Sequence, residues 1–248
     1  MTGTNLEVCV DTIEGAWIAA ENGADRIELC AALSEGGLTP SAGMMAAASR
    51  LPIPVYAMIR PRSGDFRYSD AEKTIMLRDI QLAGHHGMSG IVTGAATSDG
   101  RLDIEFLSPA LRHSGLQGTL HRVFDTLHDF PLAIADAIEA GFERILTSGQ
   151  GRKADRHLQA LAEIVRLAEG RISIMAGSGV SHLNASRILA ETGVHELHAS
   201  CSVLEKAHSS NQPEVSLGFI AQDGIRVTSA EHVRLLRAAI DTFDENRT

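Results

Sequence analysis

One short stretch of the sequence carries three ionisable side chains within five residues, since the segment 119–125 contains His121, Arg122 and Asp125. The residues before them are typical of a β-strand, in which neighbouring side chains point to opposite faces. A strand through this stretch places His121 and Asp125 on one face and Arg122 on the other. Because isolated charges are costly in a core, we interpret that face as a functional rim. A purely structural His–Asp hydrogen bond at the strand end is the alternative.

Other predicted strands also end in polar or sulfur-containing side chains. These residues are Glu7, Cys9, Glu28, Cys30, Met58, Arg60, Ser148, Met175 and His198. An inward face built from carboxylates, an arginine and a histidine is more polar than packing requires, although a buried salt bridge would explain part of it. If the protein is an enzyme, Glu7 or Glu28 and His121 are expected to exchange protons. The full set of catalytic candidates is Glu7, Glu28, Arg60, His121 and Asp125.

Soft metal ligands are present among the same residues. Thiolate, thioether and imidazole groups suit Cu(I), and the candidate ligands are Cys30, Cys9, Met58 and His121. The sequence has no local pair such as C-x-x-C that would indicate a metal site by spacing alone. Free cysteine is also a common buried residue that behaves as a small hydrophobe, so a packing role for the two thiols stays open.

Small residues and arginines indicate a site for an anion. Glycines and hydroxyl groups follow two predicted strands in the runs 147–151 and 175–180. Backbone N–H groups in such loops often bind phosphate, whereas tight turns alone would also explain the glycines. Arginine suits the same ligand. The anion-binding candidates are Arg60, Arg62, Arg122, Ser148, Gly149, Gly177, Gly179 and Ser200.

A scaffold must bring these strand ends together, and the chain alternates short apolar runs with helical patterns. Strands are expected at 6–10, 26–30, 54–60, 90–94, 119–125, 143–148, 171–176 and 196–200. Helix caps are expected at Asp11, Thr39, Ser69 and Thr228. Eight strand–helix units in 248 residues predict an α/β fold, a (β/α)8 barrel that forms one domain over residues 1–248. A doubly wound open sheet is the alternative, and a segment of about 201–227 before the last helix is expected to be irregular.

Composition excludes several classes of protein. A net charge of -9 argues against a nucleic-acid-binding protein, which normally carries a basic patch. No apolar run approaches the roughly 20 residues needed to cross a bilayer, so we expect no membrane partner. The N-terminus lacks a secretory signal pattern, and three scattered cysteines do not indicate a disulfide framework. A reducing cytoplasm is the expected location.

Several strings of the sequence closely resemble those of the CutC family, in the same order along the chain. They are 6–11, 23–30, 35–41, 58–62, 64–66, 68–69, 121–125 and 144–149. The resemblance covers residues 6 to about 200 and implies a TIM barrel, a cytoplasmic location, a homo-oligomer and a role in copper homeostasis. It also implies that Cys30 is the position usually discussed for Cu(I). Leu120 and Val123 depart from the family pattern, which usually has Phe and Ala there.

Two functions follow from these observations. The first is a copper homeostasis protein that binds Cu(I) at the barrel mouth. The alternative is a TIM-barrel enzyme that acts on a small phosphorylated or carboxylated metabolite by acid/base chemistry, with Arg60 and Arg122 holding the anionic group. The expected partners are therefore a copper ion or a small anionic metabolite, together with further copies of the chain.

Overall fold

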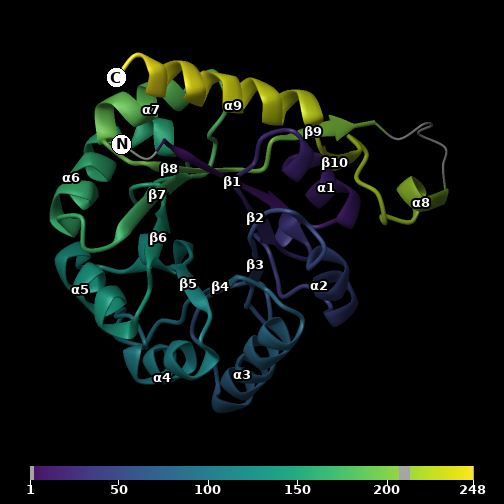
Figure 1. Cartoon of the computed structure of the whole chain (residues 1–248). Helices are drawn as coiled ribbons and strands as arrows, with labels where there is room; N and C mark the ends of the chain where they lie inside the picture. The colour runs from purple at the N-terminus through teal and green to yellow at the C-terminus, as the bar shows by residue number, and fades with distance from the viewer. Residues whose placement is uncertain (1–2, 207–212, 248) are drawn as a thin grey trace.

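The computed structural model describes residues 3–206 and 213–247. Eight parallel strands close into a barrel inside a ring of helices (Figure 1). The barrel strands are β1 (Asn5–Val10), β2 (Arg26–Leu29), β3 (Val55–Met58), β4 (Gly90–Thr93), β5 (Gln117–Leu120), β6 (Arg144–Thr147), β7 (Ser173–Gly177) and β8 (Glu196–Ala199). The surrounding helices are α1 (Ile13–Glu21), α2 (Ala42–Ala48), α3 (Asp70–His85), α4 (Ile104–Ser114), α5 (Phe130–Ala140), α6 (Leu158–Ala168), α7 (Ala185–Thr192) and α9 (Ala230–Glu245). The predicted (β/α)8 barrel is confirmed.

Closure of the sheet decides between the two predicted architectures. β1 pairs with β2 on one side and with β8 on the other, where Asn5 lies opposite Glu196 and Val8 opposite Ala199. The open-sheet alternative is therefore wrong. Because all eight strands are parallel, their carboxyl ends meet at one mouth, and residues far apart in the sequence approach one another there.

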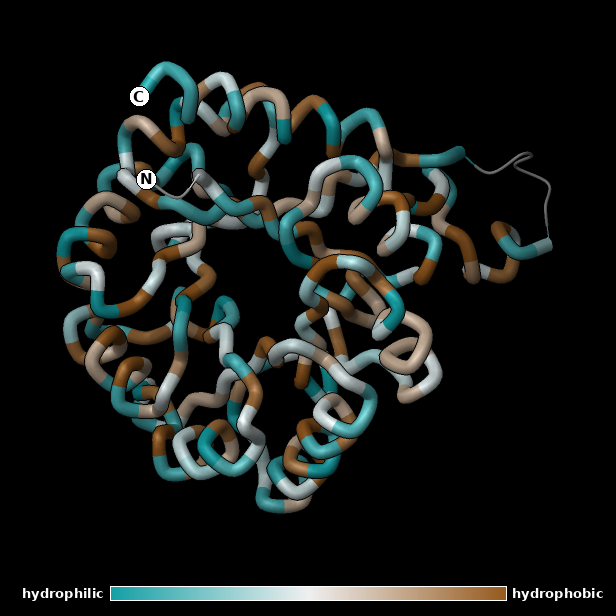
Figure 2. The backbone as a smooth tube through the Cα atoms, in the orientation of Figure 1, coloured by the Kyte–Doolittle hydropathy of each residue, from teal (hydrophilic) through white to brown (hydrophobic). Residues whose placement is uncertain are grey.

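Most of the hydrophobic core lies between the barrel wall and the helices. The strands are buried along almost their whole length, because one face packs against helices and the other fills the barrel. The helices mix apolar and polar residues (Figure 2), and each buries an apolar stripe, such as Leu161 and Ile164 in α6. Within the described ranges, none of the helices has the combined length and apolar character that crossing a membrane requires.

The segment 119–125 differs from the expected continuous strand. β5 ends at Leu120, and the 3-10 helix η2 (Arg122–Thr126) follows, with His121 as its N-cap. The backbone N–H of Val123 donates to the His121 ring, which stabilises this turn. The prediction that His121 and Asp125 share one strand face is therefore wrong, because the alternation of the strand stops before His121.

Three of the four predicted helix caps lie one or two residues away from the observed ones. The observed capping side chains are Thr12 for α1, Ser41 for α2 and Ser229 for α9. Two of the predicted caps instead fix loops at the mouth, since Asp11 accepts a hydrogen bond from the Leu33 N–H and Thr39 accepts one from the Arg60 N–H. The predicted capping box of Ser69 and Glu72 at the start of α3 is confirmed.

The segment between β8 and α9 is partly regular. It contains β9 (Ser202–Glu205), the short helix α8 (Pro213–Ser216) and β10 (Ile225–Thr228), and β9 pairs antiparallel with β10. The predicted irregular segment therefore includes a two-stranded unit, and its residues 207–212 lie outside the described part of the chain. This unit projects from the barrel beside α1 (Figure 1).

Candidate functional site

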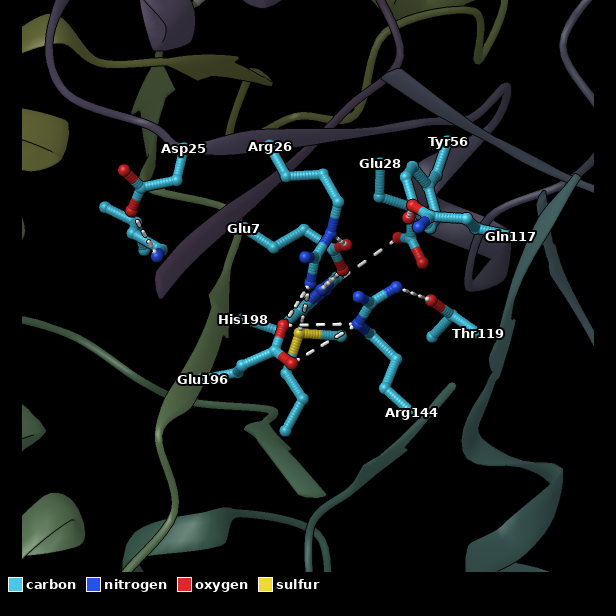
Figure 3. A network of polar contacts seen from close by, with 12 residues as sticks. Glu7, Asp25, Arg26, Glu28, Tyr56, Gln117, Thr119, Arg144, Glu196 and His198 are labelled. Carbon is cyan, nitrogen blue, oxygen red and sulfur yellow. Dashed lines mark hydrogen bonds and ion pairs between the residues drawn. The ribbon is translucent and has the colours of Figure 1, made fainter. Parts of the chain in front are cut away.

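Inward-facing residues near the beginnings of several strands form a buried network of charges (Figure 3). Arg26 donates from Nε to Glu7 and from Nη2 to Glu196 Oε2 at 2.6 Å. Arg144 adds a second contact with Glu196 at 3.2 Å. Burial alone would raise the pKa of Glu7, but Arg26 and His198 lower it to about 2. Glu7 is therefore a fixed anion in a salt-bridge network, which suits it poorly to the proton exchange predicted for it.

His198 on β8 connects this network to the barrel mouth. Its Nδ1 lies 2.8 Å from Glu7 Oε1, and its Nε2 lies 3.8 Å from Glu28 Oε2. Burial would lower the pKa of His198, but Cys9, Glu28 and Glu7 raise it well above its usual value. The imidazole is therefore protonated between two carboxylates, and its surroundings stabilise positive charge.

Glu28 has the environment of an acid/base residue. Its side chain is buried, and its Oε1 has no hydrogen-bond partner among the residues that the structure describes. Burial raises the pKa of Glu28 to about 7; Glu7 adds to the rise, and His198 opposes it. A carboxyl group that gains and loses its proton near neutral pH is suited to general acid/base catalysis.

Cys9, Glu28 and His198 together have the composition of a metal site. One ligand atom from each of these buried residues lies within 4.8 Å of the other two. Glu7 contacts the Nδ1 atom of His198, and a carboxylate commonly orients a metal-binding histidine in this way. A thiol and an imidazole are ligands that suit Cu(I).

A cavity of about 290 Å³ opens at the barrel mouth. It lies near the lower end of the sizes found for ligand pockets. Eight of the predicted site residues line it, although they come from six different strand ends. They are Cys9, Glu28, Met58, Arg60, His121, Arg122, Gly179 and Ser200. The strand ends therefore converge, and one cavity contains both the metal-ligand candidates and the catalytic or anion-binding candidates.

Cys30, the residue that the resemblance implies for Cu(I), does not line this cavity. Its Sγ donates to Glu28 Oε2 at 3.5 Å, and its side chain is fully buried against Tyr56, Met58 and Val92. Burial, with the neighbouring Glu28 carboxylate, raises the pKa of this thiol well above its usual value. An enclosed, protonated thiol is a less suitable ligand than Cys9, which the cavity reaches.

Arg60 and His121 form another part of the cavity lining. Phe66 packs against both, with its ring centroid 4.8 Å from that of His121 and 5.2 Å from Arg60 Cζ. Burial lowers the pKa of His121 to about 3, and the charge of Arg60 adds to this effect. The structure therefore places a neutral imidazole beside a buried cation.

Asp125 and Ser148 lie next to the cavity without lining it. Asp125 accepts hydrogen bonds from Arg122 Nε at 2.7 Å and from the backbone N–H groups of Ser148 and Gln150. Arg122 reaches the cavity, but its guanidinium is also held by Ser148 Oγ at 2.7 Å. These contacts brace the loop after β6 against η2, so Asp125 and Ser148 have a structural role in this arrangement.

Three more anion-binding candidates lie outside the cavity lining. Arg62 binds the Glu72 carboxylate and backbone carbonyls of its own loop. A Cβ atom at Gly149 would lie 2.9 Å from the carbonyl oxygen of His157, and one at Gly177 would lie 2.5 Å from Leu146. Close packing therefore accounts for both glycines, and loop anchoring accounts for the arginine.

Backbone strain gathers at the same mouth. Among the described residues, five non-glycine residues adopt left-handed conformations, and four of them lie in the loops after β2, β6, β7 and β8. These four are Ala32, Gln150, Ser178 and Cys201, whereas the fifth, Glu169, ends α6. Such conformations are costly and concentrate at ligand-binding sites. This observation supports the mouth as the functional face of the barrel.

Arg26, Arg144 and Glu196 were not among the predicted site residues, and no role was predicted for His198. The first three residues begin their strands, at a distance from the strand ends where function was expected. A signal was nevertheless present, because alternation places Arg26 on the same face as Glu28, and Glu196 on the same face as His198.

Comparison with known proteins agrees with this architecture. A sequence model of the CutC family matches residues 4–203. The family protein CutC of Sinorhizobium medicae is 47% identical over 239 residues, which cover 96% of this chain and 96% of the relative. The family protein CutC of Vibrio cholerae is 49% identical over 199 residues, which cover 79% of this chain and 78% of the relative.

Solved structures give the same result. CutC from Streptococcus agalactiae, described as a candidate copper homeostasis protein, has a TM-score of 0.76 at 32% identity and covers 79% of this chain and 98% of its own. A phosphoribosylanthranilate isomerase from Pyrococcus furiosus has a TM-score of 0.57 at 10% identity and covers 96% of this chain and 99% of its own, a likeness of fold alone.

The family match includes all eight barrel strands and every residue of the cavity lining. The chain therefore belongs to the CutC family.

Proposed function

We propose that this protein binds Cu(I) at the barrel mouth through the thiolate of Cys9 and the imidazole of His198. The observation that carries the proposal is the buried group of Cys9, Glu28 and His198, whose ligand atoms lie within 4.8 Å of one another. Sulfur and imidazole are ligands that Cu(I) favours. The copper homeostasis description of the Streptococcus agalactiae relative supports the same ion.

The local charge also supports a monovalent cation. Glu7 and Glu28 both contact the ring of His198, and together with Cys9 they raise its pKa. Cu(I) on Nε2 would replace the proton on that nitrogen, and its bond to Cys9 would release the thiol proton as well. Glu7 would continue to orient the ring through Nδ1.

An anaerobic Cu(I) titration against a competing chelator tests this proposal. We expect Cys9→Ser and His198→Gln to weaken Cu(I) binding by at least about tenfold, a usual effect of disturbing a metal site. Cys30→Ser is the matched control, because it makes the same chemical change at a thiol outside the cavity, and its affinity should equal that of the wild type. Absence of Cu(I) binding in the wild type, or a loss confined to Cys30→Ser, would contradict the proposal.

A second candidate function is supported by a separate observation. Glu28 Oε1, Arg60 Nε and His121 Nε2 are buried and have no partner within the described residues, and all three side chains line the cavity. Buried polar atoms are normally hydrogen-bonded, so these groups are suited to a bound molecule. We infer an enzyme that acts on a small phosphorylated or carboxylated metabolite, with Glu28 as acid/base and Arg60 near the anionic group.

Hydrogen exchange in D2O tests the enzyme. Metal-free protein is incubated with a panel of small phosphorylated and carboxylated carbonyl compounds, and loss of C–H signals is followed by NMR. We expect exchange in one compound with the wild type and with Glu143→Gln, the same change at a residue outside the cavity, and none with Glu28→Gln. Exchange that persists in Glu28→Gln, or a panel in which no compound exchanges, would rule out this candidate.

A homo-oligomeric state and a cytoplasmic location remain proposals based on the family resemblance. Sedimentation velocity over a range of protein concentrations tests the first, and cell fractionation tests the second. A single monomeric species at all concentrations would contradict oligomer formation.

A further inference from the structure

Two neighbouring side chains of the cavity lining each carry a buried nitrogen that has no partner in the described part of the chain, Arg60 Nε and His121 Nε2. The remaining nitrogens of Arg60 are occupied. Nη1 donates to the carbonyl oxygens of Glu35 at 2.8 Å and Gly37 at 3.1 Å, and Nη2 donates to that of Gly64 at 3.0 Å. Three loop carbonyls therefore hold the guanidinium through its two Nη atoms, whereas Nε has no partner among the described residues.

The hydrogen bonds of His121 determine which ring nitrogen carries the proton. The backbone N–H of Val123 donates to Nδ1 at 3.2 Å, so Nδ1 is an acceptor. A neutral ring with an acceptor at Nδ1 carries its proton on Nε2. Burial and the adjacent Arg60 lower the pKa of His121 to about 3, which keeps the ring neutral. His121 Nε2 is therefore a hydrogen-bond donor, like Arg60 Nε.

We propose that Arg60 Nε–H and His121 Nε2–H form an oxyanion site for a carboxylate or enolate oxygen of a small metabolite. This inference rests on the second candidate function and names its substrate class, a small carbonyl compound whose oxygen gains negative charge during the reaction. Phe66 contacts both side chains and fixes their relative position. Fixed donors in a dry site stabilise developing negative charge more strongly than water does.

A missing partner alone would not support this inference. Arg237 Nε also lacks a partner among the described atoms, but Arg237 does not line the cavity. Arg60 and His121 differ because both present a donor, both contact the same aromatic ring and both line one small cavity. Leaving a buried donor unpaired costs about 1–3 kcal/mol, so a ligand oxygen that accepts a hydrogen bond here would recover part of that cost.

Oxalate is the probe, because it is a small planar dianion of the size of a two-carbon enolate. Its binding to metal-free, reduced protein is measured by isothermal titration calorimetry. We expect Arg60→Lys, which keeps the charge and loses Nε–H, to weaken binding by at least about tenfold, as does His121→Phe. Arg166→Lys is the matched control, since this exposed arginine on α6 pairs with Glu163 and does not line the cavity, and it should bind oxalate as the wild type does.

A measurement on the unmodified protein keeps the test independent of variant folding. In nitrogen-15 NMR spectra of the wild type, the His121 Nε2 proton should shift downfield when oxalate is added. An unshifted proton, or equal oxalate affinity in Arg60→Lys and Arg166→Lys, would overturn the oxyanion site. Oxalate binding without turnover of any carbonyl compound would instead overturn the enzyme function and leave the oxyanion site supported. Turnover that survives Arg60→Lys and His121→Phe would overturn only the oxyanion site.

Discussion

Glu7 is a fully buried carboxylate that contacts Arg26 and His198. We expect Glu7→Gln to lower the free energy of unfolding by about 3 kcal/mol at neutral pH, since its pKa falls from 4.5 to about 2 on folding. The folded pKa lies below the unfolded one, so this contribution is complete above pH 4.5 and is lost as the pH falls toward 2. Urea denaturation at a series of pH values will show whether the difference from wild type shrinks accordingly.

The control for this prediction makes the same change at a half-exposed carboxylate. Glu143 lies 3.6 Å from Arg144 at the barrel rim, where solvent screens the pair. Glu143→Gln should change the free energy of unfolding by less than about 0.5 kcal/mol. If the two variants lost equal stability at every pH, Glu7 would not be the ionised partner of Arg26.

Single residues of the site were predictable only where the strand pattern decides their position. Glu28 was identified as a site residue because the strand ends of a barrel meet at one mouth. The different fates of Cys9 and Cys30 could not be predicted, because a loop decides them. A Cβ atom at Gly37 would lie 3.0 Å from Cys30 Sγ, so this loop covers Cys30, while Cys9 stays at the cavity.

At the scale of elements, the end of β4 controls the position of η2. A Cβ atom at Gly94 would lie 2.6 Å from Val123 Cγ1 and 2.8 Å from His121 Cε1. Gly94→Ala must therefore displace the first turn of η2. We expect a loss of about 1–3 kcal/mol in the free energy of unfolding and oxalate binding weakened by at least about tenfold. Urea denaturation and calorimetry measure the two effects.

Gly84→Ala in α3 is the matched control for this prediction. The nearest atom to its added Cβ is Leu116 Cδ1 at 3.9 Å, so there is room for a methyl group. Alanine favours a helix over glycine by up to about 1 kcal/mol, so this variant should be at least as stable as the wild type and bind oxalate normally. Equal oxalate affinity in the two variants would show that Gly94 does not position His121.

The order of the elements was predictable, whereas their ends were less so. Each helix start offers several capping residues in a row, and tertiary contacts select one of them. Asp11 was predicted to cap α1, but it binds the Leu33 N–H, and Thr12 takes the cap. In the same way β5 stops at Leu120 because the side chain of His121 accepts a hydrogen bond from the chain that follows.

At the scale of the whole molecule, eight repeated strand–helix units were sufficient to predict a closed barrel. Closing the sheet on itself leaves no strand with an unpaired edge. The two-stranded unit of β9 and β10 was not predicted. Its strands are largely exposed, so they lack the burial pattern that marks the barrel strands. The Ser229 N–H donates to the Cys201 carbonyl at 3.0 Å, so the chain leaves and re-enters the barrel at almost the same place.

This arrangement predicts that the unit can be removed without loss of the barrel. Replacing residues 202–228 by two glycines joins ends that already touch, so the barrel should still fold, as measured by circular dichroism and cooperative urea unfolding. A second cavity of about 790 Å³, lined by Phe219 and Arg226 of this segment, would disappear. Oxalate binding should change by less than about twofold, because Arg60 and His121 belong to the other cavity. An unfolded product, or one that no longer binds oxalate, would show that the segment is part of the structure that holds the site.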